Sequence, residues 1–102
     1  MLIKPYCIGS DEWNGLSKLI EELGELLQVS GKVIGSQGCT DHWSGNLTDK
    51  FVEEIGDAYA ALDFFVQKNF DSYDMTRIET QRYQKETKFI EWDMETRNVT
   101  SR

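Results

Sequence analysis

Apolar residues recur every three or four positions along three segments of the chain, a spacing typical of amphipathic helices. It predicts helices over about residues 11–34, 47–68 and 73–94. The segment between the first two helices, residues 35–45, is rich in Gly and Ser and is expected to be a loop. No alternating pattern of useful length indicates a strand. The sequence therefore predicts an all-α fold, with residues 1–102 forming one three-helix domain and residues 95–102 a frayed tail.

Residues that commonly cap helices stand near the start of each segment. Their side-chain oxygens can accept hydrogen bonds from the free N–H groups of a first helical turn. The candidates are Ser10 or Asp11, Asn46 or Thr48, and Asp71 or Ser72.

Two of the predicted helices carry acidic residues at the edge of their apolar stripe. With about 100° per residue, apolar side chains of the first helix fill an arc from about 20° to about 160° away from Glu22. Glu54 holds the same place on the second helix. Glu25 and Asp57 follow three residues later, on the same face as their partners. If the two stripes pack together, four carboxylates converge at one rim of the core.

The negative charge of such a cluster of acids must be neutralised. Unpaired buried charges are costly, and each carboxylate raises the pKa of its neighbours. The acids must either take up protons or hold hard cations, and oxygen ligands suit Mg²⁺ or Mn²⁺. The alternative is that both pairs are solvated and only interact favourably with the positive end of the helix dipole. Two copies in matching positions favour the metal site.

The third predicted helix has basic residues inside its apolar stripe. Arg82 and Lys85 occupy the middle of that stripe, where they could bind phosphate oxygens. Alternatively, both side chains extend to water along their aliphatic stems. The apolar members of the stripe are Met75, Ile78, Phe89 and Trp92.

The loop at residues 35–45 joins the two acid-bearing helices and contains His42 and Trp43. Four carboxylates can recognise only metal and phosphate, so a nucleotide base would have to be selected elsewhere. We expect the loop to close over a ligand, with Trp43 stacking on the base and His42 contacting its edge. The alternative is that Trp43 is a packing residue.

The net charge of −7 makes duplex nucleic acid and anionic membranes unfavourable partners. No apolar run suggests a signal peptide or a membrane span. The two cysteines, Cys7 and Cys39, fit a reducing compartment better than a disulfide framework, so a cytoplasmic location is expected. The chain has no phosphate-binding glycine loop of the P-loop or dinucleotide type.

The stretches EELGE (residues 21–25) and EIGD (residues 54–57) resemble the paired acidic motif of the MazG-like all-α NTP pyrophosphohydrolases. That superfamily includes MazG, the dimeric dUTPases and many small phage-encoded proteins. The resemblance implies Mg²⁺-dependent hydrolysis of a nucleoside triphosphate to the monophosphate and pyrophosphate. It implies that Glu22, Glu25, Glu54 and Asp57 bind the metal ions. Glu21, beside the metal ligand Glu22, would orient or deprotonate the attacking water.

The resemblance also implies a phosphate-binding role for Arg82 and Lys85, although the local sequence departs from the Lys/Asn-rich pattern of the family. It implies a homodimer or homotetramer that completes a four-helix core. A phage-encoded member would act in the host cytoplasm. The substrate stays open among dUTP, dCTP, dATP, dGTP and an alarmone. The rival interpretation is a non-enzymatic, acidic helical protein with an interaction or regulatory role.

Overall fold

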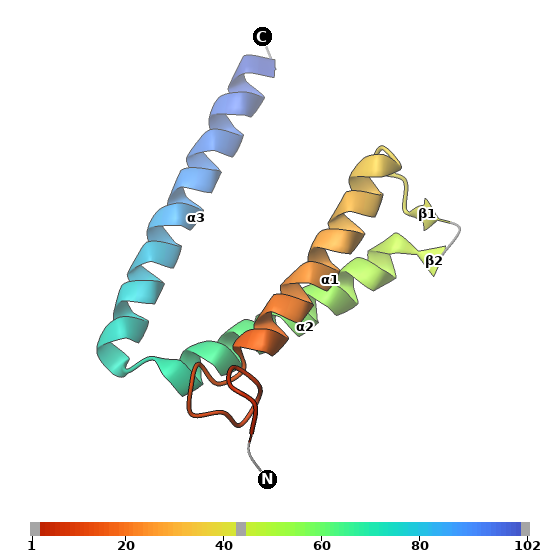
Figure 1. Cartoon of the computed structure of the whole chain (residues 1–102). Helices are drawn as coiled ribbons and strands as arrows, with labels where there is room; N and C mark the ends of the chain where they lie inside the picture. The colour runs from red at the N-terminus through yellow and green to blue at the C-terminus, as the bar shows by residue number, and fades with distance from the viewer. Residues whose placement is uncertain (1–2, 43–44, 101–102) are drawn as a thin grey trace. The chain divides into compact units, whose positions relative to one another are not determined.

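The computed structural model describes residues 3–42 and 45–100. Its elements are α1 (Leu16–Gly35), β1 (Asp41–His42), β2 (Gly45–Asn46), α2 (Leu47–Asn69) and α3 (Ser72–Thr100) (Figure 1). The all-α fold predicted from the apolar spacing is confirmed, because the only strands in the described chain are two residues long. Those strands lie within the predicted loop and pair antiparallel, Asp41 with Asn46 and His42 with Gly45.

The chain divides into two compact units, residues 1–69 and 70–102, where the sequence analysis expected one domain. In the first unit, α1 and α2 lie side by side as an antiparallel pair, with β1 and β2 at their connection (Figure 1). The second unit consists of α3 and the residues at its ends. No helix in the described part of the chain is long and apolar enough to cross a membrane.

The first unit has a small core between α1 and α2. Its buried apolar side chains on α1 are Leu19 and Val29. Those on α2 are Leu47, Ala58 and Ala61. Small side chains at a helix contact let the two helices approach closely. The acid-bearing edges of both stripes are therefore drawn into the contact.

Helix α1 begins at Leu16, so the predicted start near residue 11 is wrong. The backbone turns left-handed at Trp13 (φ 45°) and at Gly15 (φ 86°), which prevents the helix from extending backwards. Ser10 does not cap the helix. Its hydroxyl is buried and bonds within the preceding turn, donating to the Glu12 carbonyl (3.1 Å) and accepting from the Glu12 N–H (3.0 Å).

A long-range contact holds this N-terminal turn in place. The N–H of Asn14 donates to Oδ1 of Asn69 at 2.9 Å, and Nδ2 of Asn69 donates to the Asn14 carbonyl at 2.9 Å. The pair ties the residues before α1 to the last residue of α2. Because the two residues are 55 positions apart, these hydrogen bonds cannot be predicted from the spacing of apolar residues along one helix.

The other two helix starts agree with the predicted caps. Oδ1 of Asn46 accepts the N–H of Asp49 (3.0 Å) at the start of α2. Oδ1 of Asp71 accepts the N–H of Asp74 (2.8 Å) at the start of α3.

Helix α3 continues to Thr100, so the prediction of a frayed tail is wrong for residues 95–100. Nε of Arg97 lies 3.0 Å from a carboxylate oxygen of Asp93, an ion pair one helical turn apart. Such pairs support an exposed helix, and neither Gly nor Pro interrupts this one.

A broad apolar surface is left uncovered on the first unit. The α1–α2 contact uses the half of each stripe that lies next to the acids, and the far half remains exposed. We call this surface the open apolar face. It comprises Ile20, Leu23, Leu27, Ile34, Val52, Ile55, Tyr59 and Leu62.

Candidate metal centre

Four acidic side chains meet where α1 packs against α2. Glu22, Glu25, Glu54 and Asp57 each contribute one carboxylate oxygen, and these oxygens all lie within 4.8 Å of one another. Two come from α1 and two from α2. The spacing of three residues places each pair on one helix face, and the α1–α2 contact brings the two faces together.

Glu54 is buried and Glu22 is partly buried, and each has one buried oxygen without a hydrogen-bond partner. Glu54 is only 3% exposed and the Glu22 side chain 14% exposed. Oε2 of Glu54 and Oε2 of Glu22 have no hydrogen-bond partner within the described structure. Buried polar atoms in folded proteins are nearly always paired, because leaving them unpaired costs free energy. A cation bound among the four carboxylates would satisfy both oxygens.

The proximity of these acids changes their affinity for protons. The pKa of Glu25 is raised above its ordinary value, chiefly because its protonated carboxyl group can donate a hydrogen bond to the Glu54 carboxylate. The negative charge of Glu22 and partial desolvation add to this rise in pKa. In the absence of a cation, the cluster therefore retains a proton more readily than solvated carboxylates do.

Two lysines that were not predicted as part of the site border the cluster. Nζ of Lys50 lies 3.0 Å from Oε1 of Glu54. Nζ of Lys18 lies 3.2 Å from Glu21 and 3.9 Å from Glu22. Hydrogen bonds with Glu54 and Glu21, respectively, raise the pKa of Lys50 and of Lys18.

The sequence spacing of these lysines could have predicted their place beside the acids. Lys18 precedes Glu22 by four residues, and Lys50 precedes Glu54 by the same interval. Residues four apart are neighbours on a helix surface. Glu22 and Glu54 are thus each preceded by a lysine one turn earlier, so the same lysine–acid spacing occurs on both helices.

Glu21 lies beside the cluster and not within it. Its side chain is 54% exposed, and its carboxylate pairs with Lys18. The role in orienting water that the resemblance implies for Glu21 stays a prediction.

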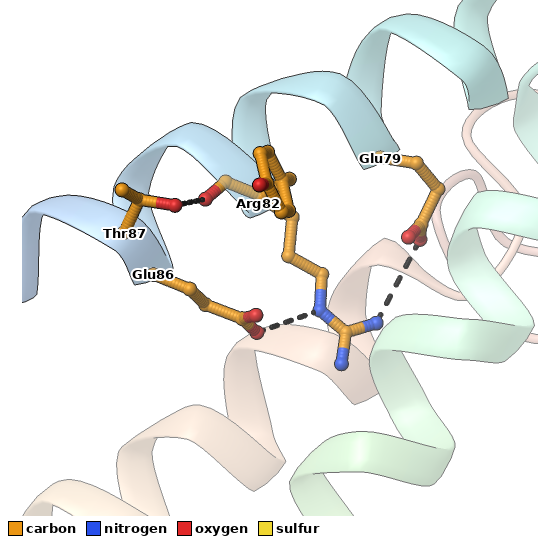
Figure 2. Close-up of polar contacts among 5 residues, drawn as sticks. Glu79, Arg82, Glu86 and Thr87 are labelled. Carbon is orange, nitrogen blue, oxygen red and sulfur yellow. Dashed lines mark hydrogen bonds and ion pairs between the residues drawn. The ribbon is translucent and has the colours of Figure 1, made fainter. Parts of the chain in front are cut away.

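The basic residues expected to bind phosphate belong to the second compact unit. Figure 2 shows Arg82 on α3 between two acids of the same helix, with its Nε 3.1 Å from Glu86 and its Nη1 3.7 Å from Glu79. Lys85 is exposed on the same helix. Arg82 and Lys85 belong to a different compact unit from the four acids, so their phosphate-binding role stays a prediction.

Two residues of the segment between α1 and α2, His42 and Trp43, are expected to contact a base. Trp43 lies outside the described residues. His42 is described only as part of the β1 backbone. The closing loop and its two base-contacting side chains therefore stay predictions.

A cavity of about 320 Å³ adjoins the acidic cluster. Glu22 and Asp57 belong to both the cluster and the cavity wall, so the two features are continuous. Among the described residues, the lining consists of Ile8, Gly15, Lys18, Glu22, Asp57, Ala60, Ala61 and Phe64.

No protein-family model, no curated protein and no solved structure matches this chain. The resemblance to MazG-like pyrophosphohydrolases thus rests on residues 21–25 and 54–57. The geometry of the four carboxylates supports a metal-binding function independently of that resemblance.

Proposed function

We propose that this protein is a Mg²⁺-dependent nucleoside triphosphate pyrophosphohydrolase of the MazG-like all-α class. Water would be consumed, and each triphosphate would yield one monophosphate and one pyrophosphate. The observation that carries the proposal is the unpartnered Oε2 of Glu54. This oxygen is buried without a hydrogen-bond partner in the described structure, and the same side chain has an oxygen within 4.8 Å of oxygens from three other acids. A buried polar atom without a partner costs free energy.

The donor set supports a hard divalent cation. All four candidate ligands are carboxylates, and Mg²⁺ and Mn²⁺ prefer oxygen donors. Four negative charges in one place would repel a triphosphate. Bound cations reverse that local field, so an acidic protein can accept an anionic substrate.

The residues of the chain have distinct parts in this proposal. Glu22, Glu25, Glu54 and Asp57 would hold the metal ions. Bound Mg²⁺ would supply charge neutralisation of the triphosphate and a water of lowered pKa. Glu21 would orient that water or accept its proton.

Basic side chains would hold the phosphates in place. Lys18 lines the adjoining cavity, and its Nζ lies 3.9 Å from Glu22, so it can reach a phosphate oxygen near the cluster. Arg82 and Lys85 are proposed to help from α3.

A second copy of the chain is the proposed cover for the open apolar face. Pairing two such faces about a twofold axis would convert two-helix layers into a four-helix core. A homodimer or homotetramer in the cytoplasm belongs to the same proposal. The same face also favours the alternative function, a non-enzymatic interaction protein whose apolar surface binds a different partner.

The test is a screen for pyrophosphate release from the common ribo- and deoxyribonucleoside triphosphates with Mg²⁺ or Mn²⁺. We expect turnover of at least one substrate. Glu22→Gln should reduce turnover by about 100-fold or more, since even groups that only support a metal ligand contribute about 10–100-fold. Glu53→Gln is the matched control, because Glu53 is an exposed acid outside the cluster.

Absence of pyrophosphate release from every nucleotide, with a stable complex formed through the open apolar face, would favour the interaction protein.

A further inference from the structure

The cavity beside the cluster has two chemically different ends. Lys18, Glu22 and Asp57 form a charged end that is shared with the acidic cluster. Every other described residue in the lining has an apolar side chain or, at Gly15, no side chain. All of these residues belong to the first compact unit. The volume, about 320 Å³, is at the lower end of the range of about 300–1,000 Å³ that is typical of small-molecule sites.

Small residues create the room in the apolar end. A side chain at Gly15 would place its Cβ 2.9 Å from the Phe64 ring, so only glycine fits there beside Phe64. Ala60 and Ala61 add two further short side chains on α2. The Phe64 ring is fixed in part by Lys68, whose Nζ lies 5.7 Å from the ring centroid.

We infer that this cavity receives the nucleoside part of a nucleoside triphosphate and selects the base by shape. The inference rests on the proposed function. The triphosphate lies at the charged end, beside the four carboxylates and Lys18. The sugar and base extend along the apolar end toward Phe64, Ala60 and Ile8.

The chemistry of the lining determines the kind of selection. None of the described side chains at the apolar end carries a hydrogen-bonding group, so these side chains do not read the edge of a base. An apolar pocket discriminates by size, and a single methylene changes selectivity by about 10–200-fold. The small volume favours pyrimidines over purines, with little distinction among pyrimidines. This assigns the selection of the base by size to the cavity between α1 and α2.

Filling the cavity tests the inference without touching a charged group. Ala60 is exposed on α2 and lines the cavity, so Ala60→Leu reduces its volume with little risk to the core. Gln67→Leu is the control, because it adds an apolar side chain on the same helix outside the cavity. In Ile8→Ala, the cavity is enlarged from the N-terminal turn.

Steady-state kinetics with dUTP, dCTP, dATP and dGTP would be combined with inhibition by inorganic tripolyphosphate and with a Mg²⁺ thermal titration. In Ala60→Leu we expect KM for every nucleotide to rise about tenfold or more. Tripolyphosphate inhibition and the Mg²⁺ shift should stay as in wild type. In Ile8→Ala we expect the preference for pyrimidines over purines to shrink. Gln67→Leu should match wild type throughout.

Unchanged KM and base preference in both cavity variants would overturn the inference while leaving the proposed function standing. If neither nucleotides nor tripolyphosphate interact with the wild-type protein in Mg²⁺, the proposed function itself fails, and the inference fails with it. Loss of tripolyphosphate inhibition in Ala60→Leu alone would place phosphates in the apolar end, which also contradicts the inference.

Discussion

Replacing Glu54 by Gln should stabilise the metal-free protein and abolish its stabilisation by metal. Glu54 is 3% exposed, and one of its oxygens lies within 4.8 Å of an oxygen of Glu22. At an effective dielectric constant of about 20, two unit charges at that separation repel by about 3.5 kcal/mol. Gln keeps the shape of the side chain and removes this repulsion.

Only part of that energy will be observed. The Lys50 ion pair with Glu54 is lost in the variant, but Lys50 is half-exposed, so the pair is weakened by solvent. If relaxation and water reduce the gain to about 1 kcal/mol, the melting temperature rises by about 4–8 °C for a domain of this size.

The assay is thermal unfolding in EDTA and again in a Mg²⁺ series. Wild type should gain stability with Mg²⁺, by about 2.7 kcal/mol when the metal is at 100 times its Kd. Glu54→Gln should gain much less, so the order of the two melting temperatures should reverse between EDTA and saturating Mg²⁺. Glu53→Gln, the exposed neighbour, should follow wild type in both conditions. A Glu54→Gln protein that melts well below wild type in EDTA would refute the reasoning and make Glu54 a structural anchor for Lys50.

Three further predictions concern the groups around the cluster. Glu25 has a raised pKa, so the folded metal-free protein binds more protons than the unfolded chain near that pKa. The stability of wild type relative to Glu25→Gln should therefore rise as the pH falls through the raised pKa toward the ordinary value of 4.5. A difference between the melting temperatures of the two proteins in EDTA that does not change with pH in this range would contradict this prediction. Lys50→Met should lower the melting temperature in EDTA and reach half of its stabilisation by Mg²⁺ at a lower Mg²⁺ concentration. Because the pKa of Lys50 is raised, the stabilising contribution of Lys50 should be complete below the ordinary pKa of 10.5 and lost at higher pH. Arg82→Ala and Lys85→Ala should raise KM or lower kcat without changing the Mg²⁺ thermal shift, whereas wild-type kinetics would show that both side chains merely extend to water.

Helical periodicity was enough to predict the parts of the structure that depend on one helix at a time. Glu22 and Glu54 hold the same angular position beside their stripes, and the helices pack through those positions. The convergence of four carboxylates followed from that repetition. The caps at Asn46 and Asp71 were likewise visible, because a side-chain oxygen that bonds three residues ahead is a local feature.

Features built by distant residues could not be predicted in this way. The start of α1 depends on the left-handed turn at Gly15 and on the bond between Asn14 and Asn69, which lies at the far end of α2. The cavity depends on Gly15 meeting Phe64, two positions that no periodic pattern connects. Ser10 looked like a cap because its residue type is right, but its hydroxyl is used inside the N-terminal turn.

The length of α3 was underestimated for another reason. Its last residues are polar, which resembles a frayed tail. Ion pairs such as Asp93 with Arg97 can support an exposed helix without an apolar face, so polarity alone did not locate the helix end.

The most direct test of the central claim is to identify the products formed from a nucleoside triphosphate in the presence of Mg²⁺. Anion-exchange chromatography would separate the nucleotides and phosphates from wild type, Glu54→Gln and Glu53→Gln. The account predicts equimolar nucleoside monophosphate and pyrophosphate from wild type and from Glu53→Gln, dependent on Mg²⁺, and almost none from Glu54→Gln. Nucleoside diphosphate with inorganic phosphate as the products, or undiminished turnover by Glu54→Gln, would contradict it.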